Sequence, residues 1–329
     1  MKSYLVRILL FISPLLLLLI GTEIYLRQRP SNFKDKKEQF LEKTGSIEIL
    51  ITGSSHAQNG LIADQFTLPA YNLAFGSQSL YFDKRITEQY LPQMPRLKYV
   101  LIALEYMSLY SEHDENRDFF YHAYYGIDFP GRSFWKESLS QTFFVYDPRE
   151  TVHLIVDDWK PAGKSVDPWT APDHFDYEKE VLSPEKNRTR AEVFQRVIEA
   201  WQGDDRVLKD LESFIADLQA HNVTPILINF PCPPTLRSLH DPKILAANQQ
   251  AIDYLTTKYN ILYLDYWDDD SFTTFDYFDP DHLNVHGAEK LSLKVNKAIM
   301  DCFGLCPRND EYEATSLRAV YGEAIQKIQ

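Results

Sequence analysis

Two adjacent serines follow a short apolar run near the start of the chain. In the stretch 49–61, ILITGSSHAQNGL, Gly53 is followed by Ser54 and Ser55. Taken alone, this pattern is a turn in which glycine allows a positive φ and a serine caps the next helix. A serine hydroxyl becomes a nucleophile only with a base within hydrogen-bond reach and a third group that orients this base. A catalytic serine therefore requires a histidine and a carboxylate elsewhere in the chain.

The stretch 278–292, FDPDHLNVHGAEKLS, supplies both groups. Asp279 lies three residues before His282, just ahead of an expected helix, so one carboxylate can hold the imidazole tautomer while the other ring nitrogen faces out. Asp281 is the local competitor for the carboxylate role. His286 follows His282 at metal-ligand spacing, but no further ligands accompany this pair, so neither a metal nor another cofactor is expected.

Alternating strand and helix patterns run through most of the sequence. Apolar runs such as KYVLIALEY are typical of strands buried on both faces, and amphipathic segments with helical spacing separate them. The expected strands cover 47–52, 70–75, 98–106, 224–230 and 260–266. This order predicts an α/β fold, a three-layer α/β/α sandwich with a mainly parallel, flavodoxin-like sheet of five strands. In such sheets ligands bind outside the carboxyl ends of the strands, where both motifs fall.

The patterns divide the chain into four parts. An apolar segment at 1–27 is followed by a polar, charged juxtamembrane linker at 28–45, and the α/β domain spans 46–302. Between about 111 and 190 the periodicity is lost; a loop of that length is usually functional or an inserted subdomain, and we expect it to cover the site. The tail at 303–329 has the pattern of one further amphipathic helix.

The apolar segment from Ile8 to Leu26 is about as long as the roughly 20 residues that a helix needs to cross a bilayer. A cleaved signal peptide is the alternative, but no small-x-small cleavage motif follows, which favours an uncleaved single-pass anchor. Two basic residues precede the segment and five follow it between Arg27 and Lys37, and this count favours a cytoplasmic domain by the positive-inside rule.

Composition excludes one class of partner. The chain has 34 Lys and Arg residues against 47 Asp and Glu residues, a net charge of −13. Without a basic surplus to displace the counterions of a phosphate backbone, nucleic acid is not expected as a partner. The acidic run at 268–270 lacks the spaced ligands and glycine of a calcium loop and is expected to be a solvated turn. Cys232, Cys302 and Cys306 are expected to be structural, since an i,i+4 pair on a helix is poorly placed for a disulfide.

Together, Gly-Ser-Ser at 53–55 and Asp-Pro-Asp-His at 279–282 resemble the serine block and the Asp-x-x-His block of the SGNH (GDSL-like) hydrolase superfamily. The resemblance implies that Ser55 is the nucleophile, that His282 is the base and that Asp279 orients it. It therefore implies a Ser-His-Asp acyl-enzyme mechanism.

The oxyanion hole departs from the family pattern. The second block of the family contributes a glycine amide, which corresponds to Gly76 in NLAFGSQS. The third block, Gly-x-Asn-Asp in the family, is replaced here by a stretch with Glu105 and no asparagine. Asn59 and Gln78 are the candidates to substitute, because one missing donor typically costs about 2.7 to 4 kcal/mol of transition-state stabilisation.

The anchor and the altered third block are most similar to membrane-anchored SGNH proteins that act on cell-envelope polymers, in the style of the teichoic-acid D-alanylation and alginate-acetylation proteins. This resemblance implies an extracytoplasmic domain, in conflict with the charge count, that moves or removes an acyl ester on a glycan or polymer. It also implies a membrane-bound acyl donor protein as a partner. Hydrolase and transferase share the acyl-enzyme, so both stay open. The alternative is a non-catalytic glycan-binding or assembly component, which the absent asparagine favours.

Overall fold

The fold is built on a five-stranded parallel sheet. The computed structural model describes residues 2–28, 31–110, 118–129, 148–157, 177–201 and 203–304. The sheet has the order β2-β1-β3-β4-β5, and every pairing is parallel. Its strands are β1 (Ile49–Thr52), β2 (Ala70–Asn72), β3 (Tyr99–Ala103), β4 (Thr224–Asn229) and β5 (Leu262–Asp265). The strand order reverses between β1 and β3, which places a ligand crevice at the carboxyl ends of these strands.

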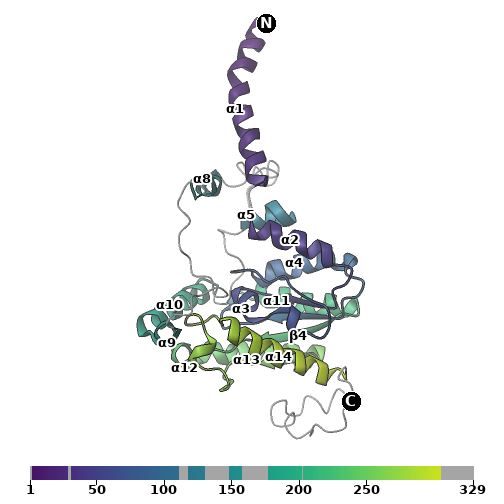
Figure 1. Cartoon of the computed structure of the whole chain (residues 1–329), viewed down its shortest axis with the longest axis vertical. Coiled ribbons are helices and arrows are strands. Elements are labelled where there is room, and N and C mark those ends of the chain that lie inside the picture. The colour runs from purple at the N-terminus through teal and green to yellow at the C-terminus, as the bar shows by residue number, and fades with distance from the viewer. Residues whose placement is uncertain are drawn as a thin grey trace.

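Helices cover both faces of this sheet. Along β1 the side chains alternate, so that Leu50 joins one core and Ile51 the other. The first core is closed by α4 (Leu80–Tyr90), α11 (Arg206–Ala220) and α13 (Pro242–Tyr259), and the second by α3 (Ser55–Gly60) and α14 (Val285–Cys302). Figure 1 shows α4 and α14 on opposite sides of the sheet. These layers confirm the predicted three-layer α/β/α sandwich.

The stretch expected as a juxtamembrane linker contains a helix, α2 (Asn32–Lys43). Phe33 and Phe40 occur one heptad apart on one face of α2, and both are buried in the core beside α4. The ammonium groups of Lys36 and Lys37 donate hydrogen bonds to the carbonyl oxygens of Ala74 and Tyr124. Burial lowers the pKa of Lys36 to about 8. Helix α2 is therefore packed into the domain that follows it.

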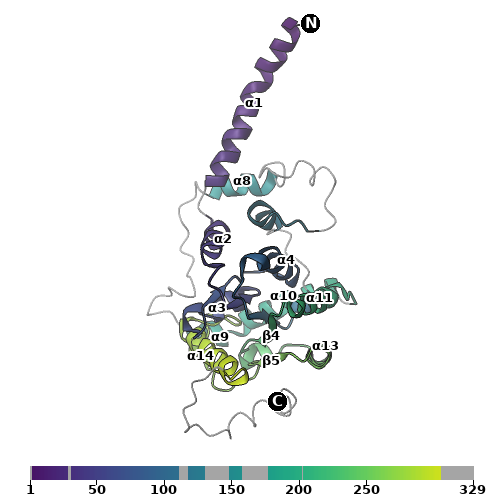
Figure 2. The same ribbon diagram turned by 90° about the vertical axis from the view of Figure 1, so that its right-hand side faces the viewer.

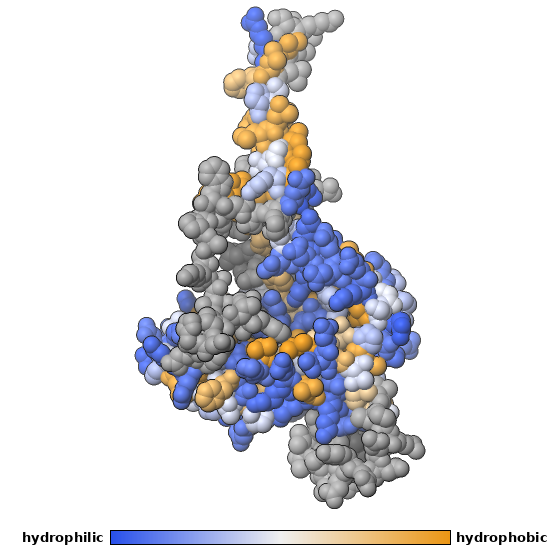
Figure 3. Space-filling view, in the orientation of Figure 1, coloured by the Kyte–Doolittle hydropathy of each residue, from blue (hydrophilic) through white to orange (hydrophobic). Residues whose placement is uncertain are grey.

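Helix α1 (Lys2–Gln28) projects away from the sheet, on the side of α2 (Figure 1). The part from Val6 to Gln28 is long and apolar enough to cross a membrane or to serve as a signal sequence, with a mean hydropathy of 2.2. Its apolar side chains are exposed over much of its length, as Figure 3 shows. At its end Leu26 is buried against Leu154 of α8 (Pro148–Asp157), a short helix that lies across the base of α1 in Figure 2.

The segment expected as an insertion at 111–190 is only partly described. Its described parts contain α5 (Asp118–Phe120), the π-helical turn η4 (Tyr121–Tyr125), α8, α9 (Tyr177–Leu182) and the start of α10 (Pro184–Trp201). Phe194 and Ile198 of α10 pack with Tyr106 and Leu236, so α10 lies beside the carboxyl ends of the central strands. The tryptophans of the insertion and the tail beyond residue 304 lie outside the described residues.

Short elements complete the described chain. They are the four-residue helix α12 (Pro234–Arg237) and the 3-10 turns η1 (Ala63–Gln65), η2 (Leu91–Gln93), η3 (Ser108–Tyr110) and η5 (Thr274–Asp276). Of these, η5 precedes the loop that carries Asp279 and His282, and α14 follows this loop.

Candidate active site

A sharp turn carries the chain from β1 into α3. Gly53 has a φ of +135°, and a Cβ atom there would lie 2.3 Å from the Cβ of Ala103 on β3, so only glycine fits. Ser54 is the N-cap of α3, and its hydroxyl accepts a hydrogen bond from the amide of His56 at 3.3 Å. Ser55 is the first residue of the helix, and its side chain is half-buried. The turn therefore uses one serine as a cap and presents the other at the carboxyl edge of the sheet.

The structure brings Ser55, His282 and Asp279 together in one line of hydrogen bonds. The Oγ of Ser55 lies 2.8 Å from the Nε2 of His282. The Nδ1 of His282 lies 2.9 Å from Oδ2 and 3.1 Å from Oδ1 of Asp279. Because Nδ1 faces a carboxylate, it carries the proton, and Nε2 is left to accept from the serine hydroxyl.

The loop that carries the imidazole is tightly fixed. The Oδ1 of Asp279 accepts the backbone amides of Asp281 and His282 at 3.0 and 2.8 Å. Asn284 caps α14 through the amides of His286 and Gly287, and its own amide group donates to the carbonyl oxygen of Phe275 at 2.7 Å. The sequence Asp-Pro-Asp-His-Leu-Asn therefore forms a turn whose polar groups hold the ring in place.

The expected oxyanion donors are largely engaged with other groups. The amide of Gly76 donates to the Oε1 of Gln58 at 2.6 Å. Gln78 is buried, and its amide group donates to Asp83 at 2.6 Å. Asn59 is half-buried in the last turn of α3 and forms no side-chain hydrogen bond to the described residues. The amide of Ser55 lies in the first turn of α3, where the helix itself supplies no acceptor.

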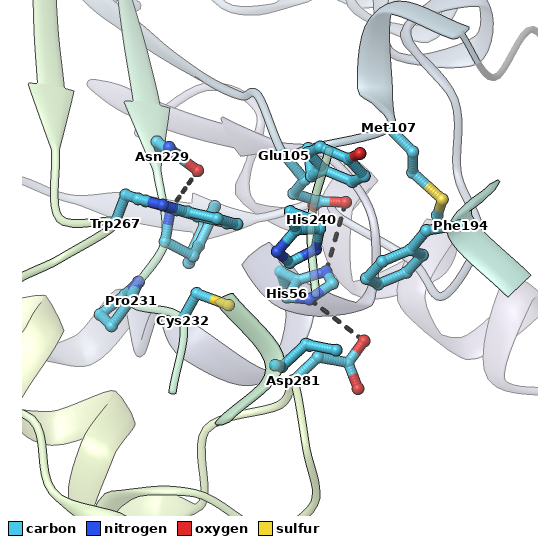
Figure 4. A pocket seen from close by; sticks show the side chains of 13 residues that line it. His56, Glu105, Met107, Phe194, Asn229, Pro231, Cys232, His240, Trp267 and Asp281 are labelled. Carbon is cyan, nitrogen blue, oxygen red and sulfur yellow. Dashed lines mark hydrogen bonds and ion pairs between the residues drawn. The ribbon is translucent and has the colours of Figure 1, made fainter. Parts of the chain in front are cut away.

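A second cluster of polar residues, centred on His56, lies against the ring of His282. The Nδ1 of His56 is 3.2 Å from Oε2 of Glu105, and its Nε2 is 3.4 Å from Oδ2 of Asp281. Asp281 also pairs with Arg190 of α10, at 3.0 Å from Nε to Oδ1. The hydroxyl of Ser54 donates to Oε1 of Glu105 at 2.6 Å. Figure 4 shows His56 between the two carboxylates.

The charges of this cluster stabilise one another. Burial alone would lower the pKa of His56, but Glu105 and Asp281 outweigh it and raise the pKa to about 10. Burial likewise opposes ionisation of Glu105, yet the charge of His56 holds the pKa of this carboxyl below its ordinary value. The pKa of Asp281 is also lowered against the effect of burial, by His282, His56 and Arg190. All four ionisable side chains of the cluster are therefore charged at neutral pH.

The sequence contains two candidate carboxylates, Asp279 and Asp281, and they make different contacts in the structure. Asp279 contacts Nδ1 of His282 at 2.9 Å, whereas Asp281 lies 3.4 Å away and pairs with His56 and Arg190. Ligating atoms of His56, Asp281 and His282 lie within 4.8 Å of one another. Since these atoms already pair with one another and with Ser55 and Asp279, we assign them to hydrogen bonds and ion pairs.

A small cavity of about 20 Å³ adjoins the cluster (Figure 4). His56, Glu105 and Asp281 form one wall, and the remainder is mostly apolar, including Trp267. His240 also lines this cavity; both its ring nitrogens are buried without a hydrogen-bond partner among the described residues, and burial lowers its pKa to about 4. The cavity has room for about one water molecule.

No protein-family model matches the sequence, and no curated protein matches it either. Among solved structures, the chain is similar to a candidate acylhydrolase from Bacteroides fragilis, with 12% identity and a TM-score of 0.39 over 83% of this chain and 100% of the other. It is also similar to a candidate platelet-activating factor protein from Streptococcus pneumoniae, with 9% identity and a TM-score of 0.39 over 88% and 98%. A candidate lipolytic protein of the G-D-S-L family from Desulfitobacterium hafniense gives 11% identity and a TM-score of 0.34 over 76% and 98%. The fold is defined by the parallel sheet order β2-β1-β3-β4-β5, and the site by the contacts among Ser55, His282 and Asp279.

Proposed function

We propose that this protein is a serine-dependent ester hydrolase or O-acyltransferase of the SGNH type. The observation that carries the proposal is the continuous line of hydrogen bonds from Asp279 through His282 to Ser55, with 2.9 Å and 2.8 Å between the linked atoms. Each contact is within the range that a nucleophile, its base and an orienting carboxylate require. The line lies at the carboxyl edge of the sheet, where ligands of this architecture bind.

In the first half of the reaction, the Oγ of Ser55 attacks the acyl carbonyl carbon while its proton passes to Nε2 of His282. Asp279 holds the opposite nitrogen and stabilises the imidazolium that forms. When the tetrahedral intermediate collapses, the bond to the leaving alcohol breaks, and this alcohol takes the proton from Nε2. Water or a sugar hydroxyl then resolves the acyl-enzyme by the same steps in reverse, giving hydrolysis or transfer.

The developing oxyanion needs hydrogen-bond donors. The amide of Ser55 is available as one of them, because it lies in the first turn of α3, where the helix itself supplies no acceptor. The amide of Gly76 would join it after releasing Gln58. This exchange requires the side chain of Gln58 to move away from an amide that it contacts at 2.6 Å. Asn59 also lies on α3, about one helical turn after Ser55, and has no side-chain partner among the described residues.

We propose further that α1 is an uncleaved membrane anchor and that the substrate is an acylated cell-envelope glycan or polymer on the extracytoplasmic side. The length and hydropathy of Val6–Gln28 support the anchor. The basic residues after it favour the opposite topology, but Lys36 and Lys37 bind carbonyl groups within the fold, so their presence has a structural reason. Fusion of a topology reporter to the chain after residue 304 would decide the orientation.

A non-catalytic envelope component is the second candidate. The hydrogen bond from the Gly76 amide to Gln58, at 2.6 Å, favours this candidate, because it occupies an expected oxyanion donor. The glutamate at the place where the family pattern has asparagine favours it as well. In that case the line of hydrogen bonds at Ser55 would remain, but turnover would be lost.

Hydrolysis of an activated acetyl ester, nitrophenyl acetate, by the full chain in detergent tests the proposal. We expect Ser55→Ala to lower kcat at least about a thousandfold, because the nucleophile is lost. Ser54→Ala is the matched control, since it removes the neighbouring hydroxyl and a helix cap but no reacting group. Equal rates for wild type and Ser55→Ala would refute the nucleophile assignment, and no turnover by the wild-type chain would favour the second candidate.

A further inference from the structure

His56 joins three segments that must meet for catalysis. It belongs to α3, the helix that begins at Ser55. Its Nδ1 pairs with Glu105, just after β3, and its Nε2 pairs with Asp281, in the loop that also holds Asp279 and His282. Glu105 and Asp281 lie 49 and 225 residues after His56 in the sequence. One ring therefore ties the helix of the nucleophile to the loop of the base.

The ring must carry a positive charge to make both contacts. Each of its nitrogens faces a carboxylate oxygen, and a carboxylate offers only acceptors, so both nitrogens bear protons. The side chains of His56, Glu105 and Asp281 are 12%, 9% and 3% exposed, so water screens these charges little. With Arg190 included, two cations face two anions, and the cluster is electrically balanced.

This balanced cluster is in direct contact with the base. The rings of His56 and His282 stack, with centroids 4.9 Å apart and an interplanar angle of 28°. The Oδ1 of Asp281 lies 3.4 Å from Nδ1 of His282. A change of one charge in the cluster is therefore transmitted to His282 over a short, poorly hydrated distance.

The surroundings contain few other charges. The described ionisable groups around the two rings are Asp279 and Asp281 in the loop of His282, Glu105 after β3, Arg190 on α10, and the uncharged side chains of Cys232 and His240. Asp279 alone is left without a cationic partner other than His282. The cluster thus leaves the carboxylate of Asp279 as the uncompensated charge beside the base.

We propose that His56 is a positioning residue that locks α3 to the Asp279–His282 loop and, by balancing Glu105 and Asp281, sets the pH at which His282 becomes a base. This inference rests on the proposed function, in which His282 accepts the proton of Ser55. It explains why a glutamate can replace the asparagine of the family pattern: its charge is cancelled by the histidine next to the nucleophile.

Opposite pH shifts follow for the two partners. His56→Gln removes a cation, so the carboxylates favour protonated His282, and the acidic limb of the kcat/KM profile moves to higher pH. Coulomb's law at 4.9 Å gives about 0.6 to 2.5 pH units for effective dielectric constants of about 80 and about 20. Glu105→Gln removes an anion, so the limb moves to lower pH. The double variant keeps the net charge and should return the limb close to its wild-type position.

The experiment measures pH profiles of Ser55-dependent ester hydrolysis for wild type, both single variants and the double variant. His240→Gln is the matched control, because it replaces a buried but uncharged histidine of the same cavity, and its limb should not move. Opposite shifts that cancel in the double variant support the proposal. Unmoved limbs, or shifts in the same direction for both single variants, overturn it, because a purely structural role gives no sign reversal.

Histidine NMR titration separates this proposal from the proposed function. In the Ser55→Ala background the pKa of His282 is read without turnover, so the same sign reversal can be sought even if the chain hydrolyses no ester. If His56→Gln fails to fold, Glu105→Gln alone must still lower the pKa of His282. An unchanged His282 titration in Glu105→Gln would overturn the proposal.

Discussion

Gly53 lies in the turn between β1 and α3, and adding a single methyl group at this position should strongly destabilise the fold. With a φ of +135°, an added Cβ would lie 2.3 Å from the Cβ of Ala103 and 3.1 Å from the Cβ of Ala57. Carbon atoms in contact are normally about 3.5 to 4.0 Å apart, so the turn would have to move about 1 Å away from β3, and by less away from α3.

Two costs add in Gly53→Ala. A non-glycine residue in a sparsely populated conformation costs about 1–3 kcal/mol, and overpacking a core costs about 1–3 kcal/mol. We therefore expect a loss of about 2–6 kcal/mol in the free energy of unfolding. At about 2–4 °C per kcal/mol for a domain of this size, Tm should fall by at least about 4 °C. Movement of the turn should also lengthen the 2.8 Å contact between Ser55 and His282 and lower kcat about a hundredfold.

Thermal unfolding followed by circular dichroism, on the full chain in detergent, measures the effect. Gly45→Ala is the matched control, because no atom lies within 4 Å of a Cβ atom built there. Adding Ala103→Gly to Gly53→Ala removes the closest contact but leaves the backbone strain, so part of the lost Tm should return. A Gly53→Ala protein that melts at the same temperature as wild type would refute the steric account of this turn.

Two further predictions concern carboxylates. Asp279→Asn should lower kcat by about ten-thousandfold, because an amide favours the wrong tautomer of His282, and Asp281→Asn should cost less; equal losses would contradict the assignment of Asp279 as the orienting group. Burial raises the pKa of Asp83, which accepts the Gly53 amide, to about 8. Its folded pKa thus exceeds its unfolded value of about 4, so its stabilising contribution is lost as pH rises from about 4 to about 8. Denaturant unfolding across this range should show stability falling in wild type and less so in Asp83→Asn; parallel profiles would exclude the linkage.

The fold could be predicted from sequence because its signals are local and repeated. Each strand is a short apolar run, since helices bury both faces of the sheet, and each intervening helix has one apolar face. The observed strands are shorter than expected at several ends: β2 ends at Asn72, whereas the expected strand ran to 75. The amides of Leu73 and Phe75 still donate to the carbonyl oxygens of Ile51 and Gly53, so the hydrogen bonding to the neighbouring segment continues beyond the regular strand.

Helix α2 was missed for a related reason. Its charged residues made the stretch at 28–45 resemble a linker, although Phe33 and Phe40 lie on one helical face. A polar helix with only two apolar anchors carries a weak periodic signal, and its lysines bind carbonyl groups on distant segments. Such contacts leave no pattern in the local sequence.

The candidate site likewise contains residues that could be predicted from the sequence and residues that could not. Residue type, order and positions at strand ends indicated a serine, His282 and a carboxylate, and the resemblance to the SGNH superfamily selected Ser55 and Asp279 among the neighbouring candidates. The role of His56 could not be predicted from its position beside Ser55, because it depends on Glu105 and Asp281, which the fold brings to its two nitrogens. The adjacent Gly-Ser-Ser-His and the unexpected Glu105 were the only signals available, and sequence spacing alone does not pair them. Likewise, the hydrogen bond between Gly76 and Gln58 depends on the path of the chain after β2.

Labelling with a fluorophosphonate probe, followed by mass spectrometric mapping of the modified residue, tests the central claim most directly. Only a serine activated by a neighbouring base reacts, so we expect a covalent adduct on Ser55, its loss in Ser55→Ala and strong reduction in His282→Gln. An adduct on Ser54, or a full-length folded chain that takes up no probe, would contradict the account.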